Sequence, residues 1–368
     1  MKVTFFLVGF LCLFTIGANA TPHTGIVTIF GSEFEDVGGF YDMFSTQIGR
    51  STIVDGVPLN EPGVFYQGGP RLEIYNNRRF SDGNNWVDYF GEDVSKDVLD
   101  GYLLEDNILP AGDGHVLVYA IGGALMNGNY YNSLVPNRPY SQLTGEPNGF
   151  TEQVGIFLEQ LEINASRAIH SNDWFVFANY GLNDIPAIVL DAAAGTNVTE
   201  DTNDFASTTL EMLQILYDSG ARHVLITYLN APSWQYLPYL WKVDPTGMFL
   251  ALTQSWGSVV HSNVIGTINE ALSTTMPELE LLWVPLGDEV TQWFARPGDY
   301  GIRPTLTSDV GDPRSSLPAV PFPTLYDMSV SRPGLNMKSA FFYSDSSPTA
   351  HTHREIANIY TRLLKSSL

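Results

Sequence analysis

The sequence predicts an α/β protein in which helices cover both faces of a five-stranded parallel sheet, as in a three-layer αβα sandwich. Short β-rich runs alternate with longer helical stretches along the chain, which is the pattern that builds parallel sheets. The runs are largely apolar, as expected of strands buried on both faces. Long loops rich in Gly, Pro, Asn and Tyr separate some of these elements and would lie over one end of the sheet.

Each element is predicted from its local pattern. The predicted strands are 25–30, 115–120, 174–179, 223–229 and 279–286. The predicted helices are 151–161, 206–219, 253–272 and 349–364, and the long loops are 58–79, 127–148 and 300–333. Because ligands of open α/β sheets bind beyond the carboxyl ends of the strands, these loops would shape any pocket.

The composition is that of one globular domain with an acidic surface. Of the 368 residues, 44% are hydrophobic and 12% aromatic, which suffices for a full-sized core. The formal net charge of −22 argues against nucleic acid and anionic membranes as partners, because both bind basic faces. We expect a single domain over residues 21–368, in a monomer that needs no cofactor.

The beginning of the sequence predicts secretion. Lys2 is followed by an apolar run over 3–16 and then by Ala18-Asn19-Ala20, which fits the small-x-small rule of signal-peptide cleavage. The run is too short to span a bilayer. We therefore expect residues 1–20 to be a signal peptide and the mature protein to be extracellular, without a membrane span.

The remaining marks of a secreted protein are few. The one cysteine, Cys12, lies within the predicted signal peptide, so the mature chain can hold no disulfide or thiolate metal site. Asn164 and Asn197 begin Asn-x-Ser/Thr triplets and are the predicted glycosylation acceptors.

A polar loop follows the first predicted strand, and the passage reads Ile-Phe-Gly-Ser-Glu-Phe-Glu-Asp-Val-Gly. It resembles the first block of the SGNH/GDSL hydrolase family of esterases and lipases, which runs Phe-Gly-Asp-Ser-x-x-Asp-x-Gly. Phe30, Gly31, Asp36 and Gly38 match that block in register. The resemblance places Glu33 at the position of the nucleophilic serine.

Four further segments resemble the family in the same order along the chain. They are 79–89, which reads Arg-Phe-Ser-Asp-Gly-Asn-Asn-Trp-Val-Asp-Tyr, and 119–124, 180–184 and 220–232. Of these, 119–124 resembles the family's second block and 180–184 its third block. The resemblance implies that Gly123 donates a backbone N–H to an oxyanion hole and that Asn183 donates its side-chain amide. It extends over nearly the whole mature chain and implies the family's αβα fold.

The last block departs from the family in its reactive residues. The family reads aromatic-Asp-x-x-His-Pro-Thr, whereas residues 342–349 read Phe-Tyr-Ser-Asp-Ser-Ser-Pro-Thr. Alignment on the Pro-Thr pair puts Ser344 at the acid position and Ser347 at the base position. A serine cannot carry a proton near neutral pH as an imidazole does. With Glu33 at the nucleophile position, the ordinary triad mechanism should be absent.

A triad rebuilt from neighbouring residues is one alternative. Ser32 would attack, with His351 or His353 as base and Asp345 as the group that orients it. Side chains alternate faces along a strand, so Ser32 should point away from the site. A histidine packed on a helix face is the more common role for His353.

Carboxylate chemistry supplies two more alternatives. Glu33 could act as a general base, or as half of a carboxylate pair with Asp345, Asp36 or Asp184. The trio Glu33, Glu35 and Asp36, with Asp184 nearby, could instead hold Ca²⁺ or Mg²⁺, although such acidic clusters are more often simply solvated.

These observations favour a secreted pseudoenzyme that has the fold of an esterase without its triad. Its expected ligand is a small molecule of the ester or carbohydrate type, or a protein partner. The alternative is an active secreted hydrolase of ester bonds, acting on lipid or acetylated carbohydrate through a rearranged site centred on Glu33.

Overall fold

The computed structural model describes the middle of the chain and its last helix. The described residues are 25–32, 34–37, 53–54, 57–58, 79, 81, 83–104, 108–122, 124–127, 149–163, 167–181, 184, 188, 195, 199–228, 248–301 and 348–367. The predicted signal peptide (1–20) and most of the three predicted long loops lie outside these residues, so they stay predictions. No helix in the described part of the chain is long and apolar enough to cross a bilayer.

The main sheet has six strands, all parallel. In spatial order they are β4 (Asp97–Asp100), β5 (His115–Val118), β1 (Val27–Phe30), β6 (Trp174–Tyr180), β7 (His223–Tyr228) and β8 (Glu280–Val284). The five predicted strands are confirmed. A separate antiparallel pair joins β2 (Ile53–Val54) to β3 (Val57–Pro58).

The predicted count of five strands was wrong because it missed β4, an edge strand. Its sequence, Asp-Val-Leu-Asp, has two apolar residues between two acids and lacks the apolar run of a buried strand. The strand forms because its backbone pairs with β5, where Val98 lies opposite Val116. Edge strands are partly solvated and often carry charge, so the pattern of a buried strand does not detect them.

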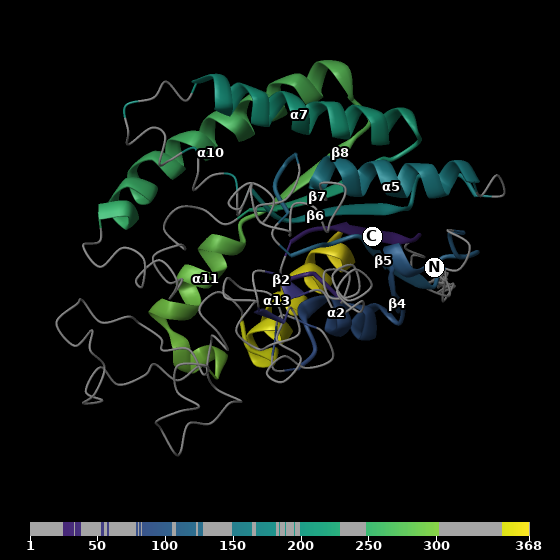
Figure 1. Cartoon of the computed structure of the whole chain (residues 1–368), viewed down its shortest axis with the longest axis horizontal. Helices are drawn as coiled ribbons and strands as arrows, with labels where there is room; N and C mark the ends of the chain where they lie inside the picture. The colour runs from purple at the N-terminus through teal and green to yellow at the C-terminus, as the bar shows by residue number, and fades with distance from the viewer. Residues whose placement is uncertain are drawn as a thin grey trace, which may run out of the picture.

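Helices cover both faces of the sheet (Figure 1). One face carries α5 (Phe150–Ile163), α7 (Thr199–Asp218) and α10 (Met248–Thr275), and the other carries α2 (Trp86–Val94) and α13 (Ala350–Ser366). The four predicted helices are confirmed as α5, α7, α10 and α13, although α7 and α10 begin earlier than predicted. The described chain also contains α11 (Leu286–Ala295) and the short 3₁₀ helices η2 (Gly101–Leu103) and η4 (Pro297–Tyr300).

The centre of the core is formed by β1 and β6, whose residues are all buried. The ring of Phe30 contacts the rings of Tyr119, Phe157 and Phe177, with centroids between 5.2 and 6.2 Å apart. Because each buried aromatic ring removes a large apolar area from water, this cluster fixes α5 against the middle of the sheet.

Two helices on the opposite face pack through aromatic side chains. Trp86 of α2 stacks on Tyr360 of α13 at 4.0 Å with ring planes only 7° apart. The Tyr360 hydroxyl shares a hydrogen bond with the Thr227 hydroxyl of β7. Burial, and next the charge of Glu35, raise the pKa of Tyr360, so its hydroxyl stays protonated. The contact joins the last helix to the sheet and to α2.

The order of the strands creates a topological switch point between β1 and β6. After β1 the chain passes to β4 and β5 on one side, and after β6 it passes to β7 and β8 on the other. The connections that leave these two neighbouring strands therefore diverge. In open α/β sheets, ligand sites form where this divergence occurs, beyond the carboxyl ends of the strands.

A buried glutamine continues the hydrogen bonding of β1 past its end. Gln153 of α5 accepts a bond from the Gly31 N–H and donates one to the Gly31 carbonyl, both at 2.9 Å. A Cβ on Gly31 would lie 2.8 Å from the Glu35 Cγ, so only glycine fits against the Glu35 side chain. The side chain of Gln153 therefore fixes the point at which the strand becomes a loop.

We expect the substitution Gln153→Ala to lower the free energy of unfolding by about 2–3 kcal/mol, because it leaves the buried Gly31 N–H unpaired, removes one of the two hydrogen bonds to the Gly31 carbonyl and opens a small cavity. Urea unfolding followed by tryptophan fluorescence measures this change. The matched control is Gln214→Ala, which removes a glutamine bonded only to exposed Asp218 on α7. Equal effects of the two substitutions would contradict the role given to Gln153.

Candidate functional site

Loops that follow three neighbouring strands meet at the carboxyl end of the sheet. We call Gly31, Ser32 and Phe34–Val37 the β1 loop. The residues after β5 include Gly122 and Met126, and those after β6 include Asp184. Buried acidic side chains make several of the contacts between these segments. The sequence predicted only some of these side chains to lie close together.

Glu35 is a fully buried carboxylate at the centre of this region. Its Oε1 accepts hydrogen bonds from the Trp86 indole and the Asn179 amide, both at 2.7 Å, and its Oε2 accepts one from the Ser32 N–H at 3.1 Å. A buried charge is tolerated only when it is well bonded, and these donors come from α2, β6 and the β1 loop. Glu35 thus joins three parts of the fold.

Asp36 is fully buried as well and connects the loops of β1 and β5. Its Oδ2 accepts a hydrogen bond from the Gly122 N–H at 3.0 Å, and its backbone N–H donates to the Ser32 carbonyl at 3.2 Å. A carboxylate that accepts a backbone N–H forms a strong, charge-assisted bond. The first and second blocks of the sequence are therefore in direct contact.

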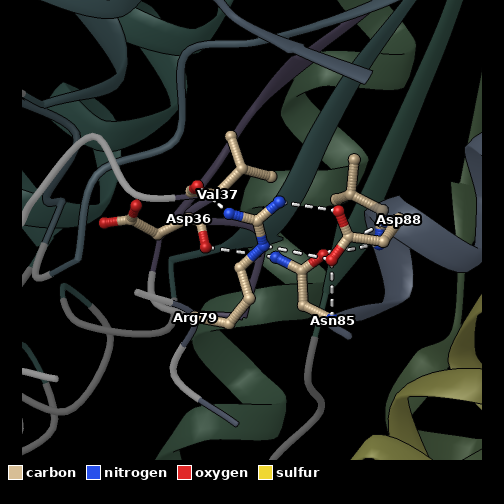
Figure 2. A network of polar contacts seen from close by, with 6 residues as sticks. Asp36, Val37, Arg79, Asn85 and Asp88 are labelled. Carbon is tan, nitrogen blue, oxygen red and sulfur yellow. Dashed lines mark hydrogen bonds and ion pairs between the residues drawn. The ribbon is translucent and has the colours of Figure 1, made fainter. Parts of the chain in front are cut away.

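Arg79 ties the β1 loop to the first turn of α2 (Figure 2). Its Nε and Nη2 donate to the two oxygens of Asp88 at 3.0 and 2.7 Å, and its Nη1 donates to the Val37 carbonyl. Asn85 caps α2 and donates from its amide to the Asp36 carbonyl at 3.1 Å. The bidentate geometry explains why an arginine and an aspartate occur at these two positions.

The start of α13 reaches the same region. Thr349 caps the helix by accepting a hydrogen bond from the Thr352 N–H. Buried His353 meets the ring of Phe34 edge-on, with ring centroids 6.1 Å apart. A Cβ on Gly83 would lie 2.7 Å from the Ala350 Cβ. The first turn of α13, which follows the last block in sequence, therefore packs on the first block and on the segment before α2.

Asp184 has the most clearly shifted carboxyl group near the site. Its Oδ1 and Oδ2 accept the Met126 N–H at 2.9 and 3.1 Å. Burial raises its pKa to about 6, and the hydrogen bond from Met126 opposes this rise. The side chain can therefore change its charge close to neutral pH. It also links the third block to the segment that follows the second.

The positions assigned to the family's chemistry lie outside the described residues. They are Glu33, Gly123, Asn183, Ser344 and Ser347, together with Asp345 and the glycosylation acceptors Asn164 and Asn197. Their predicted roles stay predictions. The structure describes residues that lie next to these positions in sequence. The residues next to the positions in the first three blocks, and those that follow the last block, lie close together.

The histidines of the alternative triad take two different positions. His351 is half-buried, and its Nε2 donates to the Tyr300 carbonyl of η4 at 2.8 Å, so this nitrogen holds a proton rather than accepting one. His353 lies against Phe34 of the β1 loop. Of the two, His353 alone contacts this loop in the described structure. The proposed orienter, Asp345, is not described.

The acidic trio is only partly described. Glu35 and Asp36 accept hydrogen bonds from backbone, indole and amide groups, and Glu33 lies outside the described residues. Within the described ranges, no group of three or more His, Cys, Asp or Glu side chains is placed to hold a metal ion.

Sequence reasoning missed the partners of Glu35. Trp86 matched the family pattern but carried no predicted contact, and Asn179 was assigned only to a strand. Asn179 has a φ of 51°, in the left-handed region, where asparagine is among the most tolerant residues after glycine. A polar residue at the end of an otherwise apolar strand was the one available signal.

Comparison with known proteins adds no further assignment. No model of a known protein family matches the chain, and no curated protein sequence matches it as a relative. The resemblance to the SGNH/GDSL blocks therefore depends on the residues quoted above.

We expect Arg79→Lys to lower the free energy of unfolding by about 1–2 kcal/mol, because an ammonium group cannot bind both Asp88 oxygens and the Val37 carbonyl in the same plane. Arg362→Lys is the matched control, since Arg362 pairs with Glu289 at an exposed position and should contribute ~0.5 kcal/mol or less. Thermal unfolding of both variants tests this. Equal shifts would show that the Arg79 geometry is unimportant.

Asp184→Asn should stabilise the protein, and more so at high pH. Because the folded pKa of about 6 exceeds the ordinary value of 3.8, the folded state holds the proton more tightly, and stability falls as pH rises through this window. Asparagine removes that penalty. We expect its stabilising effect to be about 1–2 kcal/mol greater at pH 7.5 than at pH 4.5.

Denaturant unfolding at the two pH values measures the effect of Asp184→Asn. Asp218→Asn, on the exposed face of α7, is the control and should change stability little at either pH. A destabilisation by Asp184→Asn at pH 7.5 would show that the folded protein favours the charged form of the Asp184 side chain.

Proposed function

We propose that this chain is a secreted protein of the SGNH/GDSL type that binds a ligand at the carboxyl end of its sheet without hydrolysing it. The ligand is a small molecule of the ester or carbohydrate type, or a protein partner. The proposal includes the fold of the family, a doubly wound αβα sandwich, to which β4 adds an edge strand.

The observation that carries the proposal is the meeting of the matched blocks at the switch point. Asp36 of the first block accepts the Gly122 N–H of the second, and Asp184 of the third accepts the Met126 N–H. Phe34 lies against His353 of the last helix. Segments that resemble a family in sequence order are expected to assemble in this way if they serve one site.

The loss of catalysis is inferred from the residue types at the reactive positions. Attack on an ester by a hydroxyl requires an imidazole to accept its proton and an acid to orient that imidazole. The aligned positions are Glu33, Ser344 and Ser347, none of which can take those roles near neutral pH. Buried Glu35 and Asp36 cannot replace them readily, because their oxygens already accept hydrogen bonds within the fold.

The alternative function is an active hydrolase with a rearranged site centred on Glu33. One observation favours it. The pKa of Asp184, raised to about 6, suits a group that gives or takes a proton near neutral pH. Under this alternative Asp184 would be the acid and Glu33 the base or nucleophile.

Hydrolysis assays separate the two functions. The purified protein is incubated with short chromogenic esters and acetylated sugars at pH 5, 6, 7 and 8, beside its Glu33→Gln and Asp184→Asn variants. Our proposal expects no turnover above buffer for any of the three proteins. Turnover that falls at least about tenfold in either variant would establish the rearranged site instead.

Turnover that both variants retain would also overturn the proposal and would direct attention to Ser32 and His353. Saturation-transfer NMR with the same esters and sugars then tests binding itself. A signal without turnover supports the proposed function, and the absence of any signal from every probe would contradict binding of a small molecule.

A further inference from the structure

We propose that the contact between Asp184 and Met126 is a pH-sensitive latch, which holds the segments after β5 and β6 together in acid and releases them toward neutral pH. The latch is built into the fold. The inference therefore goes beyond the proposed function and does not depend on whether the site binds or hydrolyses a ligand.

The latch spans the switch point of the sheet. β5 and β6 lie on either side of β1, and the segments that follow them meet where both oxygens of Asp184 accept the Met126 N–H, at 2.9 and 3.1 Å. The Met126 carbonyl is attached to α5, because it accepts the N–H and the hydroxyl of Thr151, both at 3.2 Å. Loss of the Asp184 bond would therefore release the segment after β6, while Met126 stays on α5.

The carboxyl group of Asp184 is poorly compensated when it is charged. Its donors are the backbone N–H groups of Met126 and of Asp184 itself. No Lys, Arg or His side chain among the described residues forms an ion pair with it. Glu35, by contrast, accepts hydrogen bonds from an indole, an amide and a backbone N–H. A carboxyl group withdrawn from water with so few donors favours its protonated form.

The ionisable groups nearby do not supply the missing positive charge. From β6, the hydroxyl of Tyr180 bonds to the Thr209 hydroxyl of α7 and to the Met126 sulfur, and not to Asp184. Burial above all, and the charge of Asp184 in addition, raise the pKa of Tyr180, so this side chain stays neutral. In the first turn of α5 the ionisable residue is Glu152, an acid that already accepts a backbone N–H.

The direction of the response follows from proton linkage. Burial raises the pKa of Asp184 to about 6, from an ordinary value of 3.8. A released Asp184 is solvated and titrates near the ordinary value, so the latched form binds the proton more tightly. Rising pH removes this proton and favours release, chiefly between pH 3.8 and about 6. Between pH 4.5 and 7.5 the released fraction should grow about tenfold or more.

Hydrogen exchange of the Met126 amide tests the latch directly, because this N–H is the bonded donor. The protein is labelled with isotopic methionine, and the Met126 and Met212 signals are assigned through their substitution by leucine. NMR gives the exchange rates at pH 4.5, 5.5, 6.5 and 7.5, each divided by the intrinsic rate at that pH. We expect protection of Met126 to fall about tenfold or more over this range. Met212, buried in α7, should be the better protected of the two at pH 7.5.

The matching variant is Asp184→Asn, which keeps a side-chain acceptor for the Met126 N–H but cannot become charged. We expect its Met126 protection to be independent of pH. The control is Asp218→Asn, at the exposed end of α7, which should keep the pH response of the unaltered protein. Because the pH series needs no substitution at Asp184, it decides even if Asp184→Asn does not fold.

Three results would overturn the inference. They are constant protection of Met126 across the pH range, equal protection of Met126 and Met212 at every pH, and an unchanged pH response in folded Asp184→Asn. The second result would mean that both amides exchange only when the whole protein unfolds. The experiment contains no ligand, so its outcome is independent of the hydrolysis and binding assays that test the proposed function.

Discussion

The arrangement at the carboxyl end of the sheet depends on one buried carboxyl group, that of Glu35. A desolvated carboxylate is costly unless donors surround it, and Glu35 meets that condition only when three separate segments are in place. The β1 loop, α2 and β6 must therefore assemble together. Removal of one donor would raise the free-energy cost of burying the carboxylate, which the other two contacts alone would then have to offset. This coupling makes the region more rigid than its loop structure alone would suggest.

The sequence was informative about the sheet because its strands are buried on both faces. Apolar runs located β1, β5, β6, β7 and β8, and longer apolar stretches located the helices on both sides. The edge strand β4 was not predicted, because an apolar run reflects burial of the side chains and not pairing of the backbone. The site was harder to predict. Local motifs indicated which loops matter, but the contacts of Glu35 span 51 and 144 residues in sequence, and no local pattern encodes such pairs.

The two buried acidic residues of the first block, Glu35 and Asp36, have separate hydrogen-bond partners although they are adjacent in sequence. Glu35 and Asp36 read in the sequence as a possible cluster for a cation, whereas each is bonded separately, one to α2 and β6 and the other to the loop after β5. Neighbouring residues in a loop can point in different directions, so proximity in sequence does not establish a common ligand.

The edges of the sheet affect how copies of this chain meet one another. At one edge β4 begins with exposed Asp97 and ends with Asp100, and at the other β8 begins with exposed Glu280. Two sheets that approached edge to edge would bring carboxylates together at the strand ends, in a protein whose net charge is already −22. Electrostatic repulsion thus opposes strand-to-strand aggregation, and acidification or high salt would weaken this protection by neutralising or screening the same groups.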